Sequence, residues 1–168
     1  DKTFFSFEYF PPKTDEGTEN LYTRIDRMSK LGPLFIDVTW GAGGSTASKT
    51  IEISTNAQNY TGLETQVHMT CTNMSRQDLR KSIEQCKKGG IQNLLALRGD
   101  PPLNAAKWEQ AESGFSFACD LVKFTREEFG DYFGIAVAGY PEGHPDGNYE
   151  DDLRHLKEKV DAGADFVI

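Results

Sequence analysis

The chain has 168 residues and a formal charge of −8 at pH 7. This length is sufficient for one domain with a sizeable core, and a hydrophobic fraction of 38% with 11 phenylalanines argues against a disordered chain. The negative charge argues against a nucleic acid or an anionic membrane as a general partner, although it is compatible with a local basic pocket for a phosphate.

Three cysteines, Cys71, Cys86 and Cys119, lie far apart and form no CxxC pair. This usage is typical of buried thiols in a reducing compartment, so we expect a cytoplasmic location. No apolar run approaches the length of a membrane span, and no signal peptide is visible. The chain begins at Asp1 rather than Met and enters a strand within a few residues, which suggests that its front is trimmed.

Strand and helix patterns alternate along the chain, at about 30 residues per pair. Apolar runs predict strands at 3–9, 34–39, 64–70, 93–97, 132–138 and 165–168. Apolar residues at helical spacing, preceded by capping residues, predict helices from about 14 to 31, 47–59, 75–88, 115–129 and 149–162. We expect helix 115–129 to bury Phe117, Leu121 and Phe124, and helix 149–162 to carry an apolar side of Leu153, Leu156 and Val160.

Repeated βα units form either an open doubly wound sheet or a (β/α)8 TIM barrel. Two observations favour the barrel. The GxGxxG fingerprint of a dinucleotide-binding open sheet is absent after the first strand. Each of the first five strands also delivers polar residues to the same end, as barrel enzymes do; these are Glu8, Thr39, His68, Arg98 with Asp100, and Tyr140.

A complete barrel needs eight units and about 250 residues. The predicted elements supply the first five βα units and the start of strand six, so we expect residues 1–168 to be the N-terminal portion of a longer barrel. Such a portion leaves two sheet edges open.

Glu8, Arg98 and Asp100 are the strongest candidates for chemistry. Glu8 follows an aromatic run, so we expect its carboxyl to be partly desolvated, which suits a general acid. The alternative is a strand-end carboxylate paired with a lysine. Arg98 and Asp100 follow a buried strand directly, but they could instead pair with charges of the neighbouring helices.

His68 and the turn 140–145 each have a structural and a functional interpretation. A single histidine near a strand end is more often a satisfied core residue than a ligand. A metal site from Glu8, His68, Asp100 and His144 is conceivable, but no pair has the spacing that would make it a strong prediction. The stiff turn around Tyr140 and His144 is either structural or suited to a planar ligand.

Together these segments resemble the methylenetetrahydrofolate reductase family, through essentially the whole chain. Each motif is short, but their order and spacing make the resemblance specific. The motifs that carry it are FEYFPP at 7–12, VTWGA at 38–42, HMTC at 68–71, ALRGDP at 96–101, AGYPEGHP at 138–145 and LKEKVDAGAD at 156–165. Trp40 and the Lys-Glu-Lys run are closer to eukaryotic members than to bacterial ones.

The resemblance implies a (β/α)8 barrel that binds FAD at the carboxyl ends of its strands. It implies an enzyme of one-carbon and methionine metabolism in which NADPH or NADH reduces the flavin, leaves, and is replaced by methylenetetrahydrofolate, which becomes methyltetrahydrofolate. It further implies a cytoplasmic protein with a small-molecule substrate and no nucleic-acid or membrane partner. The complete protein is expected to be a homo-oligomer.

The resemblance also implies roles for individual residues. Glu8 would be the general acid that protonates the folate nitrogen, and Asp100 would contact the folate and lie beside the flavin ring. The FAD-binding residues would be Thr39, Trp40, His68, Arg98, Gly99, Asp100, Phe117, Ala118, Tyr140, His144, Pro145, Asp146, Gly147, Asp152 and Lys159. The nicotinamide cofactor would be bordered by Glu8, Tyr9, Phe10, Pro11, Pro12 and Lys13.

This chain departs from the family pattern in two respects. Glu158 stands where bacterial members have an arginine. The chain also stops before the threonine-glutamine pair of strand six, so the later folate-binding residues and the C-terminal regulatory domain are absent, and we expect residues 1–168 alone to be inactive. Two other functions are compatible with the sequence: a metal-dependent barrel lyase or hydrolase using Glu8 and Asp100, and a non-catalytic FAD-binding fragment.

Overall fold

The computed structural model describes residues 3–41, 46–100, 113–144 and 147–168. Within these ranges parallel strands alternate with helices along the chain. The strands are β1 (Phe7–Tyr9), β2 (Phe35–Val38), β3 (Glu64–Thr70), β4 (Asn93–Leu97), β5 (Gly134–Val137) and β6 (Phe166–Val167). The helices are α1 (Asp15–Ser29), α2 (Ala47–Thr61), α3 (Arg76–Lys88), α4 (Ala118–Phe129) and α5 (Tyr149–Asp161).

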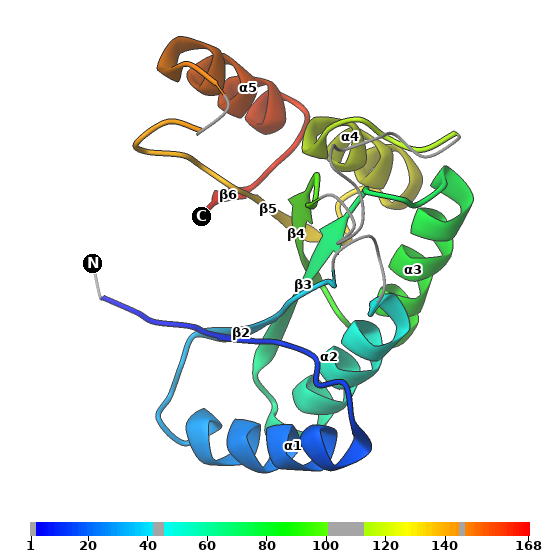
Figure 1. Cartoon of the computed structure of the whole chain (residues 1–168), viewed down its shortest axis with the longest axis vertical. Helices are drawn as coiled ribbons and strands as arrows, with labels where there is room; N and C mark the ends of the chain where they lie inside the picture. The colour runs from blue at the N-terminus through cyan, green and yellow to red at the C-terminus, as the bar shows by residue number, and fades with distance from the viewer. Residues whose placement is uncertain (1–2, 42–45, 101–112, 145–146) are drawn as a thin grey trace.

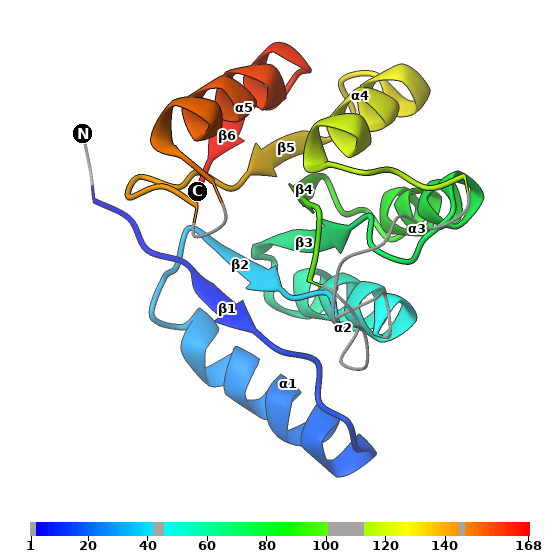
Figure 2. The same cartoon turned by 45° about the horizontal axis from the view of Figure 1, so that its top comes forward.

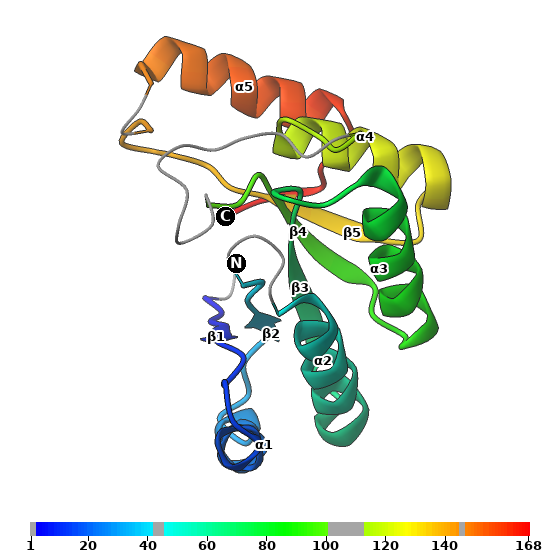
Figure 3. The ribbon, with the colours of Figure 1, turned by 45° about the vertical axis from the view of Figure 1, so that its right-hand side comes forward.

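The strand order in the sheet is the same as the order in the sequence, β1-β2-β3-β4-β5-β6, and every pair is parallel. The sheet curves, and the helices surround its outer side (Figures 1 and 3). Figure 2 shows the strands following one another from β1 to β6 around this curve. A doubly wound sheet would reverse its strand order and carry helices on both faces. The predicted fold class is therefore confirmed: the chain forms part of a (β/α)8 barrel.

Strand side chains alternate between the two faces of the sheet, and the helix-facing set forms the core. The larger core cluster includes Val67, Met69, Leu94, Ala96, Ile135 and Val137, packed with Leu79, Ile83 and Leu121 of the helices. The smaller cluster is Tyr9, Leu21, Ile25, Ile36, Val38, Ile53 and Ala57. Within the described ranges no helix combines the length and the apolar character needed to cross a membrane.

Three of the five helices begin at a side-chain cap of the kind expected from the sequence. Thr14, Ser75 and Asn148 each accept a hydrogen bond from a backbone N–H in the first turn, at 3.0, 3.2 and 2.9 Å. At the other end of α2, Gly62 takes a left-handed conformation and ends the helix. Local capping therefore fixes where the helices begin.

Several predicted elements are longer than the observed ones, and two of them show the reasons. Strand 3–9 is reduced to Phe7–Tyr9, because β1 is an edge strand that pairs only with β2 in the described sheet. Helix 115–129 begins at Ala118, with Phe117 as its N-cap. Phe117 is 59% exposed, so its predicted burial is wrong; Phe115 is buried instead and packs on Phe124, with ring centroids 5.2 Å apart.

Helix α5 is less buried than its amphipathic pattern predicted. Leu153 and Val160 are exposed, and among its apolar side chains only Leu156 packs against the larger core cluster. The reason is position: α5 lies beside α4 and precedes β6, the last strand of the described sheet (Figure 1).

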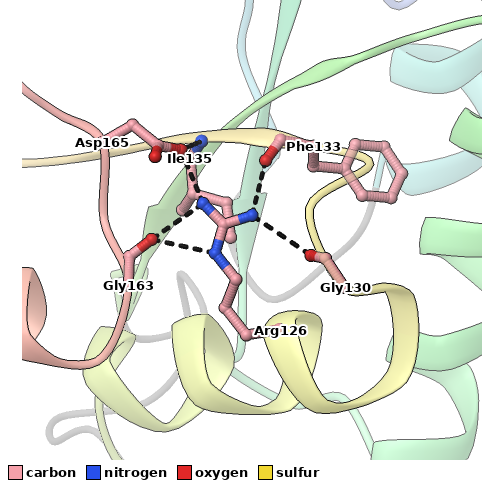
Figure 4. A network of polar contacts seen from close by, with 6 residues as sticks. All are labelled: Arg126, Gly130, Phe133, Ile135, Gly163 and Asp165. Carbon is pink, nitrogen blue, oxygen red and sulfur yellow. Dashed lines mark hydrogen bonds and ion pairs between the residues drawn. The ribbon is translucent and has the colours of Figure 1, made fainter.

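Arg126 of α4 connects α5 to the rest of the fold (Figure 4). Its guanidinium donates to the carbonyl oxygens of Gly163, Phe133 and Gly130, with Nη2 2.8 Å from Gly163 and Nη1 2.7 Å from Phe133. Nη2 also lies 2.6 Å from Oδ2 of Asp165, which in turn accepts from the backbone N–H of Ile135. One side chain thus joins the α4–β5 turn to the α5–β6 turn.

We expect Arg126→Lys to lower the free energy of unfolding by about 2–4 kcal/mol, because an ammonium group cannot reach this fan of acceptors and leaves carbonyls unpaired. Arg27→Lys, on the exposed last turn of α1, is the matched control and should change it by less than about 0.5 kcal/mol. Urea unfolding midpoints of the two variants measure the difference. Equal midpoints would show that the Arg126 contacts contribute little.

Candidate functional site

A cavity of about 670 Å³ opens at the carboxyl ends of β2 to β5. Its floor comes from strand ends and its sides from the first turn of α4 and one face of α5. The residues that line it are Phe10, Thr39, Trp40, His68, Thr70, Ala96, Leu97, Arg98, Gly99, Asp100, Phe117, Ala118, Cys119, Asp120, Lys123, Ala138, Tyr140, His144, Gly147, Asp152, His155, Glu158 and Lys159. A volume of this size is typical of small-molecule and cofactor sites.

The cavity gathers almost all of the residues predicted to hold the cofactor. Of the fifteen named in the sequence analysis, thirteen line it: Thr39, Trp40, His68, Arg98, Gly99, Asp100, Phe117, Ala118, Tyr140, His144, Gly147, Asp152 and Lys159. The remaining two, Pro145 and Asp146, lie outside the described residues. The predicted convergence of strand ends is therefore observed for β2, β3, β4 and β5.

The segment Glu8 to Lys13 behaves differently, since only Phe10 of this segment lines the cavity. Glu8 is exposed, so its predicted partial desolvation is wrong for this structure. The reason is position: alternation puts Glu8 on the same face as its register partner Asp37, but β1 is the edge of the described sheet, with no strand on its other side. Tyr9 packs in the core cluster with Leu21 and Ile25, and burial raises the pKa of its phenol.

Lys159 is the best-defined cation of the cavity. Its Nζ donates to the carbonyl oxygen of Ala138 at 2.6 Å and lies 5.8 Å from the centre of the Tyr140 ring. Burial lowers the pKa of Lys159, and the nearby Asp152 carboxylate opposes part of that shift. The amine is thus held at the end of β5 with hydrogen-bonding capacity directed at the cavity.

The turn after β5 is ordered by the same helix. The Tyr140 and His144 rings meet edge to face, with centroids 4.8 Å apart, and Gly143 allows the turn with a φ of +85°. The backbone N–H of His144 donates to Oδ2 of Asp152 on α5. The turn is therefore both stiff and part of the cavity wall, so the two interpretations drawn from the sequence are compatible.

Gly99 sets the exit of β4, where Arg98 and Asp100 flank it. It has a φ of +90°, and a Cβ atom there would lie 2.7 Å from Cβ of Thr70 and 2.9 Å from Oγ1 of Thr72. The hydroxyl of Thr72 donates to the carbonyl oxygen of Arg98 at 2.7 Å. Only a glycine fits this conformation at this separation, so the backbone that carries Arg98 and Asp100 is fixed against β3.

The sequence pattern did not predict the buried polar cluster that lies on the interior face of the sheet. Nε2 of Gln66 donates to Oδ1 of Asp37 at 2.7 Å, and Nε2 of His68 lies 3.4 Å from the same oxygen. Asp37 is 5% exposed and His68 is 9% exposed. The alternation of side chains along a strand could have predicted this cluster. Asp37 lies two residues before Thr39, and Gln66 lies two residues before His68, so each shares a sheet face with a predicted cavity residue.

Helix faces supply further cavity residues that were not predicted, among them Cys119, Lys123 and His155. His155 lies three residues after Asp152 and four before Lys159, both predicted, so the three share one side of α5, and Cys119 and Lys123 stand four apart on α4. The same spacing rule could have identified Lys123 and His155. With Arg98 and Lys159, Lys123 gives the cavity three basic side chains in a chain of net negative charge.

Two buried polar atoms of lining residues have no hydrogen-bond partner among the described residues: Nε1 of Trp40 and Oγ1 of Thr70. Both atoms are buried from solvent, so neither faces the open cavity. The aromatic faces and the cations of the lining suit a planar, phosphate-bearing molecule.

Two of the three cysteines are fully buried, as the sequence predicted, and the third is not. Cys71 and Cys86 are fully buried, and burial raises the pKa of their thiols to about 11 and about 12. Cys119 is only partly buried and lines the cavity, with burial raising the pKa of its thiol as well. Among the described residues, no three His, Cys, Asp or Glu side chains come together as metal ligands, which gives the alternative metal site no support there.

Known proteins match this chain along its whole length. The sequence profile described as methylenetetrahydrofolate reductase matches residues 1–168. The chain is 55% identical to methylenetetrahydrofolate reductase (NADH) 1 of Zea mays over 99% of its own length and 30% of the maize protein. It is 49% identical to methylenetetrahydrofolate reductase 2 of Saccharomyces cerevisiae, over 99% of this chain and 29% of the yeast protein. The chain thus spans less than a third of these relatives.

Solved structures of low sequence identity share the fold. Deoxyribose phosphate aldolase from Aeropyrum pernix superposes with a TM-score of 0.64 at 14% identity, over 97% of this chain and 61% of the aldolase. A 2,3-dimethylmalate lyase superposes with a TM-score of 0.63 at 10% identity, over 98% of this chain and 57% of the lyase. At these identities the likeness concerns the fold alone, and it agrees with a partial (β/α)8 barrel.

We expect Gly99→Ala to lower the free energy of unfolding by about 2–4 kcal/mol, because it combines a strained φ with a steric clash. Gly62→Ala is the control: its φ is also positive, at +72°, but a Cβ atom there meets nothing within 4 Å. The control should cost about 1 kcal/mol. Denaturant midpoints compare the two, and equal losses would mean that the approach to Thr70 and Thr72 is not limiting.

Proposed function

Because the chain belongs to the methylenetetrahydrofolate reductase family, we propose that it provides the flavin-binding part of an enzyme that reduces methylenetetrahydrofolate to methyltetrahydrofolate. The electron donor is a nicotinamide dinucleotide. Relatives named for NADH and for NADPH both match the chain, at 55% identity for the maize protein and 41% for the protein of Caenorhabditis elegans.

One observation carries the proposal: a single cavity gathers the lining residues that the family resemblance assigns to FAD. Arg98, Lys123 and Lys159 supply the positive charge that a pyrophosphate requires. Tyr140, Trp40 and Phe117 supply aromatic surface for planar rings.

When bound, FAD would accept hydride from the nicotinamide and supply it to the folate. The chain's own residues handle protons and charge. Glu8 donates a proton to the folate nitrogen whose bond to the methylene carbon breaks, which leaves an iminium cation as the hydride acceptor. Asp100, at the cavity mouth, stabilises that cation with its negative charge. The exposed position of Glu8 leaves it accessible to a substrate from the open side of the sheet.

The remaining assignments follow from the same proposal. The segment Glu8 to Lys13 borders the nicotinamide, and Phe10 joins that segment to the cavity. In the relatives the matched part is 30% or less of the plant and yeast proteins, so folate-binding residues beyond this chain are part of the proposal. Residues 1–168 alone would not turn over. The whole enzyme is proposed to be a cytoplasmic homo-oligomer that acts on a small molecule.

The absorbance spectrum of the full natural polypeptide tests the cofactor. We expect bound flavin absorbance that is bleached by NADH or NADPH and restored by methylenetetrahydrofolate. A colourless protein whose activity requires an added divalent cation would overturn the proposal in favour of a metal-dependent lyase or hydrolase. Flavin absorbance without bleaching or turnover would leave only a binding function.

The role of Glu8 is tested by Glu8→Gln in the same polypeptide. Loss of the proton donor should slow folate reduction by about 10²–10⁴-fold, while the nicotinamide still bleaches the flavin near the parent rate. Stopped-flow measurement of the two half-reactions separates these effects. Glu16→Gln, on the exposed first turn of α1, is the control and should leave both rates unchanged. Folate reduction near the parent rate in Glu8→Gln would contradict the assignment.

A further inference from the structure

The buried cluster of Asp37, Gln66 and His68 has a function that the cofactor contacts alone do not explain. We infer that Asp37 is a positioning residue that fixes the proton of His68 on Nε2 and so presents Nδ1 to the ligand of the cavity. The identity of that ligand rests on the proposed function, but the proton assignment does not.

The geometry of the sheet brings the three side chains together. Asp37 and Gln66 are partners in the parallel register of β2 and β3, and His68 lies two residues further along the same face. Gln66 donates to Oδ1 of Asp37 at 2.7 Å, and His68 Nε2 approaches the same oxygen to 3.4 Å. All three residues are buried, at 5%, 6% and 9% exposed.

The hydrogen-bonding chemistry of the Asp37 carboxylate then determines which ring nitrogen of His68 carries the proton. An ionised carboxylate only accepts hydrogen bonds, so a histidine nitrogen that faces it must carry the proton. Within the described ranges, His68 is the only basic side chain in ion-pair range of Asp37. The register partner of Asp37 on the other side is Glu8, which supplies no cation. A buried carboxylate in this setting favours the Nε2–H form of its imidazole neighbour.

The second nitrogen of His68 is the functional one. The residue lines the cavity between Thr39 and Thr70, and its Nε2 is directed to Asp37. In the neutral ring, Nδ1 is then a hydrogen-bond acceptor, which suits an N–H group of a planar ligand. Gln66 has a supporting role, because its amide holds the carboxylate oxygen toward which the imidazole turns. Asp37 therefore acts on the ligand through His68.

The test is ¹⁵N NMR of histidine-labelled natural polypeptide, without added flavin. The sequence has only three histidines, so the spectrum is simple and a His68→Asn variant assigns it. We expect His68 to carry its proton on Nε2 in the parent. Asp37→Asn should lower the population of the Nε2–H form, because an uncharged amide oxygen in the place of Oδ1 is a weaker acceptor than the carboxylate and an amide nitrogen in that place would donate to Nε2 instead.

Flavin binding gives a second readout. Asp37→Asn should raise the flavin dissociation constant about tenfold, a typical loss when the partner that orients a ligating histidine is changed. Glu64→Gln is the matched control: it removes a carboxylate from the same face of β3, at an exposed position bonded to Asn93. It should change neither the tautomer nor the affinity.

Each outcome has a defined meaning. A parent His68 protonated on Nδ1 overturns the inference, as does an Asp37→Asn protein whose tautomer populations equal those of the parent. If Asp37→Asn does not fold, the parent spectrum alone decides. A parent that shows the Nε2–H form but binds no flavin supports the inference about Asp37 and contradicts the proposed function, so the two failures are distinguishable.

Discussion

In-register pairing of parallel strands is the constraint on which the site depends. Each strand of this sheet lies beside its sequence neighbour, and all strands end at the same side. Residues that follow different strands therefore lie close together at the carboxyl ends of the strands. Alternation then sorts the side chains: the helix-facing set makes the core, and the opposite set makes the rows that hold Asp37, Gln66 and His68. Fold and site therefore arise from one geometric rule.

The parts predictable from sequence are those governed by short-range rules. Strands β3 and β4 have the expected bounds because an apolar run is enclosed by unambiguous turns, and the cavity was anticipated because strand ends must converge. The start of α4 was missed because its N-cap, Phe117, has no capping oxygen; the stabilising bond runs from its N–H to the carboxylate of Asp120. The exposure of Glu8 and of Leu153 depends on which neighbours cover an edge, and local pattern carries no such information.

Charge is distributed to serve the cavity rather than the surface as a whole. The chain is acidic, yet Arg98, Lys123 and Lys159 converge at one end of the sheet from β4, α4 and α5. Asp152 lies close to Lys159 and also accepts from the turn that holds His144, so the same carboxylate balances a cation and orders a loop. Four carboxylates, Asp100, Asp120, Asp152 and Glu158, line the same cavity, so its cations stand among acidic groups.

The hydrogen bonds of Arg126 also bear on how this molecule opens. The guanidinium and Asp165 together fasten the turn after α4, the start of β5 and the turn after α5. Residues tied in this way exchange their amide protons as a unit, since no one of these segments can separate while the others stay in place. Arg126 therefore couples the opening of the last two βα units of the described sheet, and it adds to the contacts that α5 makes through its own Leu156, Lys159 and Asp152.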